Sequence, residues 1–433
     1  MALITKKLRG TEDVLPAESY RWQFLEEIMR EQARVYGFAE IRTPVFENTQ
    51  LFQRGVGETT DVVQKEMYTF LTKGGESVTL RPEGTAGAAR ALLEHGVYND
   101  GLPVKASYFV SCYRYEKPQA GRLREFHQFG LEVYGTSKPM ADAELICAAA
   151  SIFDRLGIDD LSLEINSIGC PTCRAKYHAA LKEYFESHED ELCETCKGRL
   201  ERNPMRILDC KSKICSGIAK DAPVILDYLC DECEEHFKGV KACLDTAGMK
   251  YTVNPRIVRG LDYYTKTVFE FVSGSIGAQS TVCGGGRYDG LIEELGGQPL
   301  PSLGFALGME RLLLLLDSKG IEIPKPETCA LYVAALGENA EAKAFALVKD
   351  LRDASLHAQY DIVGRGLKAQ MKYANKIGAK FSIVIGDSEL ESGKASLKDM
   401  EEGTETVINI DEIVEELGEA IRVKIFKNIA EIM

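Results

Sequence analysis

The sequence predicts an α+β protein: a mostly antiparallel sheet carrying helices, interrupted by a mainly helical insertion and followed by a small C-terminal α/β domain. Three observations carry this prediction. Short strand-like runs lie on both sides of a cysteine-rich, charged segment that has helical patterning. After a linker that contains Pro324 and Pro326, strands and helices alternate, as is typical of α/β domains. A chain of 433 residues also exceeds what one hydrophobic core usually fills.

The first segment, residues 1–168, begins with an amphipathic helix within "SYRWQFLEEIMREQARVYGF". Strand-like runs follow in "VTLRPEG", "VKASYFVSCYRYE" and "FHQFGLEVYG". Residues 169–248 are rich in cysteine and charged residues and have a mainly helical pattern. Strand-like patterns resume in residues 249–322. Because strand-like patterns lie on both sides of the middle segment, that segment is expected to be an insertion.

The last segment, residues 327–433, predicts a partly parallel sheet with helices. A strand is expected in "CALYVAAL", then a helix at about 340–354, a strand in "YDIVG", a lysine-rich helix and a strand in "KFSIVIGD". On the lysine-rich helix, Lys368, Lys372 and Lys376 recur every four residues and form one basic stripe. The stripe is either a solvated helix face or a surface for phosphates.

Composition limits the possible functions. The formal charge of −14 argues against a non-specific nucleic-acid binder, although a local basic face is compatible with it. No run approaches the roughly 18 apolar residues of a membrane span, and the N-terminus lacks the apolar core of a secretory signal. We therefore expect a cytoplasmic protein without a membrane partner, whose 13 cysteines are thiols, metal ligands or nucleophiles.

Polar residues at a strand-to-helix corner form the first candidate site. In "TLRPEGTAGAARAL", Glu83 follows a proline and Thr85 opens a helical run. One interpretation is a helix cap with a surface acid. The other is a pair of acceptors for a substrate ammonium group.

A hairpin with a basic tip forms the second candidate site. In "YRYEKPQAGRLREFHQFGLEVYG", Arg114 and Glu116 lead into a loop that carries Lys117, Arg122 and Arg124. Guanidinium groups at such a tip suit the oxygens of a polyphosphate, whereas solvated surface charge is the simpler explanation.

Two further features indicate buried polar groups. Gln128, Gly130 and Glu132 alternate onto one face of the returning strand, where packing does not explain a glutamine and a glutamate. In "SLGFALGMERLLLLL", Arg311 interrupts a strongly apolar helix. It needs an anionic partner unless its side chain extends to solvent.

The stretch "VRGLDYYTKTVFEF" predicts a strand whose first half carries costly polar groups. Strict alternation puts Arg259 and Tyr263 on one face and Tyr264 on the other. These side chains share a pocket only if the backbone bends, and Gly260 is where we expect a bulge or kink.

Eight cysteines cluster between residues 170 and 233. Three pairs have C-x₂-C spacing and one pair is a looser C-x₄-C: Cys170 and Cys173, Cys193 and Cys196, Cys230 and Cys233, and Cys210 and Cys215. The spacing favours two tetrahedral Cys₄ zinc sites, with simple packing as the alternative for some of the thiols. The sequence does not assign the pairs to sites.

Taken together, these motifs resemble the class II aminoacyl-tRNA synthetases, and among them the histidyl-tRNA synthetase family. The segments "EIRTPVFE", "YRYEKPQAGRLREFHQFGLEVYG" and "GFALGMERLLLLL" look like the motifs 1, 2 and 3 of that class. "RGLDYYTKTVFEF" and "GGGRYDGL" look like the two histidine-specific signatures, and "RGLKAQMKYANKIGAKFSIVIGD" extends the resemblance into the C-terminal domain. The resemblance implies a homodimer that binds histidine, ATP with Mg²⁺, and tRNA(His), with an insertion that clamps the acceptor stem.

The resemblance also implies residue roles. Arg259 and Arg114 would contact the α-phosphate, Arg259 also the histidine carboxylate, and Arg311 the ATP. Further ATP contacts would come from Glu116, Arg122 and Phe126. The histidine-binding set would be Glu83, Thr85, Arg114, Gln128, Glu132, Arg259, Tyr263, Tyr264 and Tyr288. In that set Glu83, Thr85 and Gln128 would bind the α-amino group, while Glu132 and Tyr264 would bind the imidazole nitrogens.

One other function stays open: a catalytically silent paralogue that senses histidine as a regulatory subunit of ATP phosphoribosyltransferase. That paralogue resembles a catalytic domain alone and departs at motif residues, whereas Glu83, Arg114 and Arg311 are present here together with an anticodon-binding-like domain. A pseudo-synthetase domain of a kinase is not supported, because no kinase signature precedes the synthetase-like segments.

Overall fold

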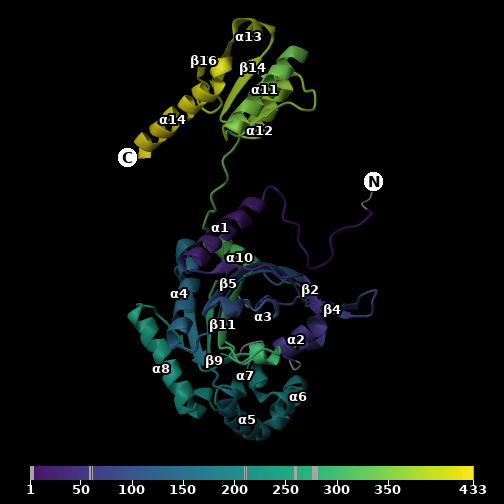
Figure 1. The fold of residues 1–433 in the computed structure, drawn as a ribbon, viewed down its shortest axis with the longest axis vertical. Helices are drawn as coiled ribbons and strands as arrows, with labels where there is room; N and C mark the ends of the chain where they lie inside the picture. The colour runs from purple at the N-terminus through teal and green to yellow at the C-terminus, as the bar shows by residue number, and fades with distance from the viewer. Residues whose placement is uncertain are drawn as a thin grey trace. The chain divides into compact units, whose positions relative to one another are not determined.

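The structure is a computed structural model that describes residues 4–432 except 58, 59, 61, 209, 211, 258–260 and 276–280, with side chains described up to residue 424. The chain forms two compact units, Met1–Pro324 and Lys325–Met433 (Figure 1). Among the described helices, none is long and apolar enough to cross a membrane.

A large sheet organises the first unit. Within the described residues it has eight strands in the order β1-β5-β6-β11-β10-β9-β7-β8. Their bounds are Ala39–Glu40 (β1), Val104–Tyr113 (β5), Glu125–Tyr134 (β6), Ser302–Gly308 (β11), Thr281–Arg287 (β10), Thr265–Val272 (β9), Ser162–Ser167 (β7) and Thr252–Val253 (β8). The edge pairs β1·β5 and β7·β8 are parallel and all the other pairs are antiparallel. The predicted α+β class with a mostly antiparallel sheet is therefore confirmed.

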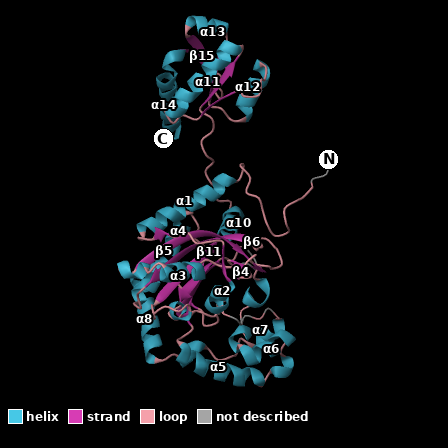
Figure 2. Ribbon diagram, turned by 45° about the vertical axis from the view of Figure 1, so that its right-hand side comes forward, coloured by secondary structure: helices cyan, strands magenta, loops and turns pink. Residues whose placement is uncertain are grey.

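Helices cover one face of this sheet and bury the main core. They are α1 (Ser19–Val35), α4 (Pro139–Arg155), α8 (Asp231–Thr246) and α10 (Met309–Lys319). Successive side chains of a strand point to opposite faces, so Phe129 and Leu131 of β6 enter this core while Gln128 and Glu132 face the other side. Figure 2 shows α1 and α4 on one side of the sheet and α2 and α3 on the other.

The opposite face carries smaller elements. The helices are α2 (Thr49–Val56), α3 (Thr85–Glu94) and α9 (Leu291–Glu294). A three-stranded antiparallel sheet, in the order β2-β4-β3, adjoins them with the strands Phe46–Asn48 (β2), Ser77–Leu80 (β4) and Thr69–Leu71 (β3). These elements therefore lie on the face of the large sheet toward which Gln128 and Glu132 point.

The cysteine-rich segment is mainly helical. Its helices α5 (Pro171–Glu186), α6 (Glu194–Arg202) and α7 (Lys213–Ile218) lie together (Figure 1). Their core is separate from the main core and includes Tyr177, Leu181 and Phe185 together with buried cysteines. The following helix, α8, instead packs Phe237 and Val240 into the main core. The segment 169–248 is thus divided between two hydrophobic cores.

The second unit is an α/β sandwich built on the sheet β13-β12-β14-β15-β16. Its strands are β12 (Leu331–Ala335), β13 (Ala358–Tyr360), β14 (Phe381–Ile385), β15 (Lys394–Asp399) and β16 (Glu405–Asn409), and its helices are α11 (Glu338–Asp353), α12 (Leu367–Lys376), α13 (Asp387–Ser392) and α14 (Ile413–Ile432). The strands β12, β13 and β14 are parallel and the rest are antiparallel. The partly parallel sheet expected from the sequence is present.

Two strand predictions were wrong in extent. The strand expected in "VRGLDYYTKTVFEF" begins only at Thr265, because residues 261–264 form a turn. Alternation therefore does not govern Tyr263 and Tyr264, and the bulge expected at Gly260 lies outside the described residues. The strand expected in "YDIVG" is instead β13, three residues that end at Tyr360; Ile362 and Val363 are exposed beyond it and do not pair.

Candidate active site

A cavity of about 610 Å³ lies among α3, the loop between β5 and β6, and the strands β6, β9, β10 and β11. Ten of the predicted site residues line it: Glu83, Thr85, Arg114, Glu116, Arg122, Phe126, Gln128, Tyr263, Tyr264 and Arg311. Glu132 and Tyr288 are buried and bonded to each other directly beside Gly304. Arg259 lies outside the described residues, but Ile257 and Leu261, which flank the gap, line the cavity.

Glu83 is a buried helix cap. Its carboxylate accepts hydrogen bonds from the backbone N–H groups of Thr85 (2.7 Å) and Ala86 (2.8 Å), which are otherwise unbonded at the start of α3. Burial raises the pKa of Glu83 despite these bonds. The interpretation as a surface acid was therefore wrong, whereas the capping role is correct and coexists with a position in the cavity lining.

Glu132 is a fully buried carboxyl group held by two phenols. Its Oε1 accepts from the hydroxyl of Tyr108 at 2.8 Å and its Oε2 accepts from the hydroxyl of Tyr288. Burial raises the pKa of Glu132 to about 8. Space for this group comes from Gly304 on the neighbouring strand, since a Cβ there would lie 1.6 Å from the Glu132 Oε2.

Tyr263 and Tyr264 line the cavity and pack against Tyr288, which is buried with Glu132 behind the lining. Their ring centroids lie 4.7 Å apart, and the Tyr263 ring lies 5.3 Å from that of Tyr288. The turn that carries them is held from the insertion, because Arg174 donates to the carbonyl oxygens of Asp262 (3.5 Å) and Tyr264 (3.2 Å). One end of the cavity therefore combines carboxyl, hydroxyl and aromatic groups.

Arginines gather at the other end. The Arg114 Nε donates to the carbonyl oxygen of Pro82 at 2.9 Å, and its guanidinium lies 5.3 Å from the centre of the Phe126 ring. Arg122 forms an ion pair with Glu116. Because these groups are anchored before any ligand arrives, they offer a preorganised site for anionic oxygens.

Arg311 joins the same end from α10. Its Nη1 donates to the carbonyl oxygen of Thr281 at 2.8 Å and its Nε to that of Gly121 at 3.3 Å. Burial lowers the pKa of Arg311, and the positive charges of Arg122 and Arg114 lower it further. Its side chain therefore turns into the cavity rather than out to solvent, and its position favours an anion.

Sequence reasoning missed several residues that the fold brings to the site. Tyr108 stands on β5 opposite Gly130, and a Cβ at Gly130 would lie 2.3 Å from the Tyr108 ring. Pairing the residues of β5 and β6 one by one, starting from the loop that joins them, would have placed Tyr108 near Glu132. The cavity lining also includes Glu164, Asn254, Arg256, Glu270, Thr281 and Glu310, none of which belongs to a pattern recognisable from sequence.

The eight clustered cysteines form two groups of four. One group is Cys170, Cys173, Cys230 and Cys233, and the other is Cys193, Cys196, Cys210 and Cys215; in each group all the Sγ atoms lie within 4.8 Å of one another. In the first group the pKa of Cys170 is lowered to about 6. Burial acts in the opposite direction, but hydrogen bonds from the backbone N–H groups of Cys173 and Thr172 and from neighbouring thiols outweigh it. This donor set fits a tetrahedral Zn²⁺.

The basic stripe of the second unit lies on α12. Lys368, Lys372 and Lys376 are exposed along this helix at the predicted spacing. Their binding of phosphates stays a prediction.

Comparisons with known proteins point in one direction. A family profile described as histidyl-tRNA synthetase matches residues 10–194 and 215–312, and a profile described as anticodon binding domain matches residues 330–420. A histidine–tRNA ligase from Caldanaerobacter subterraneus is 57% identical over 411 residues, which are 95% of this chain and 99% of the relative. The apo histidyl-tRNA synthetase of S. aureus is 40% identical with a TM-score of 0.82, and the match covers 96% of this chain and all of that one.

A solved structure described as an ATP phosphoribosyltransferase regulatory subunit/histidyl-tRNA synthetase from Bacillus halodurans is also similar. It is 20% identical with a TM-score of 0.62, and the match covers 89% of this chain and 99% of that one. At this identity the likeness concerns the fold alone.

Proposed function

The chain belongs to the histidyl-tRNA synthetase family and attaches histidine to tRNA(His) with ATP, and on this basis we propose that the 610 Å³ cavity is where histidine and ATP react. The observation that carries the proposal is the meeting of two unlike ends in one cavity. One end holds Glu83, Tyr263 and Tyr264, with Glu132 buried behind them, and the other holds Arg114, Arg122 and Arg311. The first suits an amino acid with a polar ring, and the second suits phosphates.

The reaction needs positioning more than a strong base. An oxygen of the histidine carboxylate forms a bond to the α-phosphorus, the bond to the pyrophosphate oxygen breaks, and pyrophosphate leaves. The terminal ribose hydroxyl of the tRNA then attacks the carbonyl carbon: the ester bond forms, the bond to the AMP oxygen breaks, and the hydroxyl proton passes to a phosphate oxygen of the leaving AMP. In both steps negative charge builds up on the oxygens of a leaving phosphate group, pyrophosphate first and AMP second, and fixed guanidinium groups stabilise that charge.

At the nucleotide end, Arg114 and Arg311 would bind the phosphates, and Arg259 would join them from outside the described residues. Phe126 supplies a face for the adenine ring and Glu116 an acceptor for its amino group. Mg²⁺, when bound, neutralises phosphate charge, and carboxylates such as Glu270 at this end fit its preference for oxygen ligands.

At the amino acid end, Glu83, Thr85 and Gln128 would bind the α-ammonium group and Glu132 would accept from the imidazole. Tyr264 and Tyr288 complete that end. A site that reads a ring by buried hydrogen bonds rejects an analogue without the bond, because its own polar groups then stay unpaired. The proposal is tested by measuring histidine-dependent exchange of pyrophosphate into ATP in an Arg114→Ala variant, in which the exchange rate should fall.

The regulatory alternative is not favoured. The relatives that cover nearly the whole chain at more than 50% identity are named as histidine–tRNA ligases. A histidine sensor without activity would show no exchange of pyrophosphate into ATP.

We assign the parts of the chain accordingly. The catalytic domain comprises residues 1–168 and 249–322, the insertion residues 169–248 and the anticodon-binding domain residues 327–433. The division into two compact units at Pro324 and the separate core of α5, α6 and α7 support this assignment. We place the enzyme in the cytoplasm, where its thirteen cysteines, none of them in a disulfide, suit a reducing compartment.

We also propose that the two cysteine groups each hold one Zn²⁺. Bound zinc would cross-link segments that are distant in sequence and so stabilise a region with a small core. Metal analysis of the purified enzyme should give two zinc ions per chain, falling to one in Cys233→Ser and to one in Cys196→Ser.

The matched control for the zinc prediction is Cys243→Ser, which changes a half-buried thiol on α8, the helix that also carries Cys233. This variant should keep two zinc ions. Chelation should lower the midpoint of thermal unfolding of the wild type. Wild-type enzyme that is purified without added chelator and carries no zinc would contradict the proposal.

The enzyme is expected to be a homodimer through the sheet β2-β4-β3. Large apolar side chains are exposed around this sheet: Val45, Phe46, Phe70 and Leu71 have 42%, 54%, 49% and 69% of their surface exposed. Sedimentation should give twice the chain mass, and Phe46→Glu with Leu71→Glu should halve it. Val407→Glu, at an exposed apolar side chain of the second unit, is the control and should not dissociate the dimer. A monomeric wild type would refute the assignment.

A further inference from the structure

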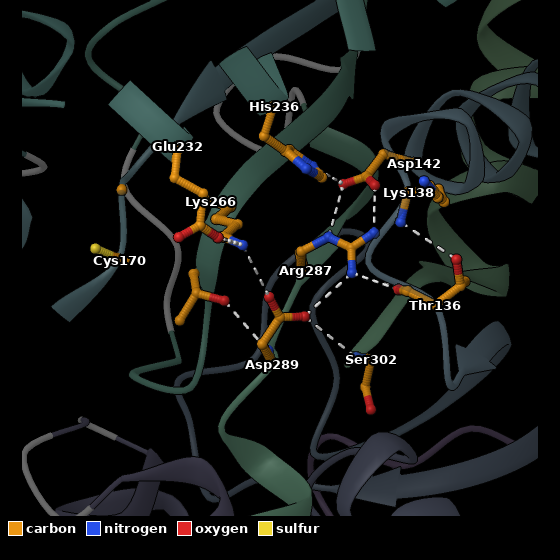
Figure 3. Close-up of polar contacts among 12 residues, drawn as sticks. Thr136, Lys138, Asp142, Cys170, Glu232, His236, Lys266, Arg287, Asp289 and Ser302 are labelled. Carbon is orange, nitrogen blue, oxygen red and sulfur yellow. Dashed lines mark hydrogen bonds and ion pairs between the residues drawn. The ribbon is translucent and has the colours of Figure 1, made fainter. Parts of the chain in front are cut away.

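A buried ion network lies behind the histidine end of the cavity, centred on Arg287. This arginine is 0% exposed, and each of its three side-chain nitrogens is hydrogen-bonded. Its Nε lies 3.2 Å from Asp142 Oδ1 and its Nη2 is bonded to Asp142 Oδ2, while Nη1 donates to the carbonyl oxygen of Thr136 (2.7 Å) and to Asp289 Oδ1 (3.1 Å). Figure 3 shows the guanidinium held between the two aspartates.

The network joins elements that are far apart in sequence. Asp142 lies on α4 and also contacts the Nε2 of His236 on α8 at 3.3 Å. On the other side, Lys266 of β9 lies 3.7 Å from Asp289 Oδ2 and 2.8 Å from Glu232 Oε1 (Figure 3). Although burial opposes it, His236 and Arg287 hold the pKa of Asp142 below its usual value, so the pair with Arg287 is charged.

A buried ion pair of this kind is weak support for stability. Removing two charges from water is costly, and apolar residues of similar volume often stabilise a core equally well. Arg287 and Asp142 therefore contribute something that apolar side chains at the same positions would not. A guanidinium that is held by several fixed hydrogen bonds can set the backbone conformation of the residues next to it.

That neighbouring chain carries Tyr288. At Arg287 the pairing of β10 with β9 shifts, since Gly286 pairs with Val268 but Arg287 pairs with Thr265. Arg287 points to α4, and Tyr288, the next residue, points to Glu132 on the cavity side. Such irregularities re-aim a side chain, and here the re-aimed side chain is the phenol that bonds Glu132.

Both neighbours of Tyr288 are anchored. The Tyr288 N–H donates to the carbonyl oxygen of Ser302 at 2.8 Å, and Asp289 Oδ1 accepts from the Ser302 N–H at 3.3 Å. The same Asp289 oxygen accepts from Arg287. The phenol therefore has little freedom to move unless Arg287 moves.

We propose that Arg287, paired with Asp142, is a positioning residue for the recognition of the imidazole ring: it fixes Tyr288, and Tyr288 fixes the carboxyl group of Glu132. The proposal rests on the assignment of Glu132 to the imidazole. A displacement of about 1 Å in such a group costs on the order of 10²-fold in rate.

The test compares the KM values for the two substrates in pyrophosphate exchange. Arg287→Lys should raise the KM for histidine about 10-fold or more, because lysine would hold Tyr288 less precisely but would not displace it by a full 1 Å. The KM for ATP should stay unchanged. The double variant Arg287→Met with Asp142→Leu removes both fully buried charges together, and Asp289, which is partly exposed, keeps Lys266 as its partner, so the variant should fold. It should show the same selective rise.

A double-mutant cycle with Tyr288→Phe separates positioning from a general loss of structure. If Arg287 acts through Tyr288, replacing Arg287 in a Tyr288→Phe background should add little to the KM for histidine. Lys105→Met is the matched control: it breaks the 2.8 Å pair between Lys105 of β5 and Glu144, which joins the same sheet to the same helix away from the cavity. It should lower the unfolding temperature without changing either KM.

Several results would overturn the proposal. They are an unchanged KM for histidine in the folded double variant, a parallel rise of both KM values, and full additivity with Tyr288→Phe. If Tyr288→Phe and Glu132→Gln themselves left the KM for histidine unchanged, the assignment of the imidazole end would fall as well, so the two failures are distinguishable.

Discussion

Replacing Arg114 by alanine should lower kcat for histidine-dependent pyrophosphate exchange by about 10²–10³-fold, the usual cost of losing one preorganised donor to a developing charge. Arg114 is anchored before ATP binds, through its Nε bond to the carbonyl oxygen of Pro82 and its stacking on Phe126. The charge it stabilises is greatest in the transition state, so kcat should fall more than the KM for ATP rises. Arg114→Lys should recover only part of the loss, because an ammonium group cannot form a forked pair of bonds.

The matched control for Arg114 is Arg30→Ala. The Arg30 guanidinium also stacks on an aromatic ring of the same hairpin, Phe109 at 4.5 Å, but Phe109 packs against the core on the opposite face of the sheet. This variant should keep kcat. Equal losses in both variants, or a change confined to the KM for ATP, would show that Arg114 does not act on the reacting phosphate.

Replacing Glu132 by glutamine should reduce kcat/KM for histidine by about 10²-fold, because leaving a buried hydrogen-bonding group of the imidazole unpaired costs about 1–3 kcal/mol. The loss should be specific to the ring. With 2-thienylalanine, which lacks a ring N–H, Glu132→Gln should change kcat/KM far less, so the preference for histidine over this analogue should shrink.

Glu125→Gln is the corresponding control. Glu125 lies on the same strand and accepts from the hydroxyl of Tyr113 at 3.1 Å, much as Glu132 accepts from Tyr108. It should leave the preference for histidine unchanged. If Glu132→Gln reduced kcat/KM for histidine and for 2-thienylalanine equally, Glu132 would not be the group that recognises the imidazole.

The parts of the site that were predictable from sequence are those set by local periodicity. Alternation along "FHQFGLEVYG" put Gln128 and Glu132 on one face, and the structure has both on the side of the sheet away from the main core. The corner that carries Glu83 followed from a proline, a glycine and a helical run. In each case the signal spans fewer than ten residues, so tertiary packing has little opportunity to alter it.

The parts that were not predictable depend on long-range pairing. Arg287 and Asp142 are 145 positions apart, and nothing local to either one indicates that they meet. The grouping of Cys170 with Cys230 across 60 positions has the same cause. The extent of the strand before Thr265 was misjudged because Tyr263 and Tyr264 have high strand propensity, whereas their hydroxyl-bearing rings are needed in a turn beside the cavity.

The most direct test of the account is a crystal structure of the enzyme with a non-hydrolysable analogue of histidyl-adenylate. The account predicts that an imidazole nitrogen lies within hydrogen-bonding distance of the Glu132 carboxyl group, while the phosphate oxygens or their substitutes contact Arg114 and Arg311. An analogue bound in the cavity with its ring directed away from Glu132, or bound outside the cavity, would contradict it.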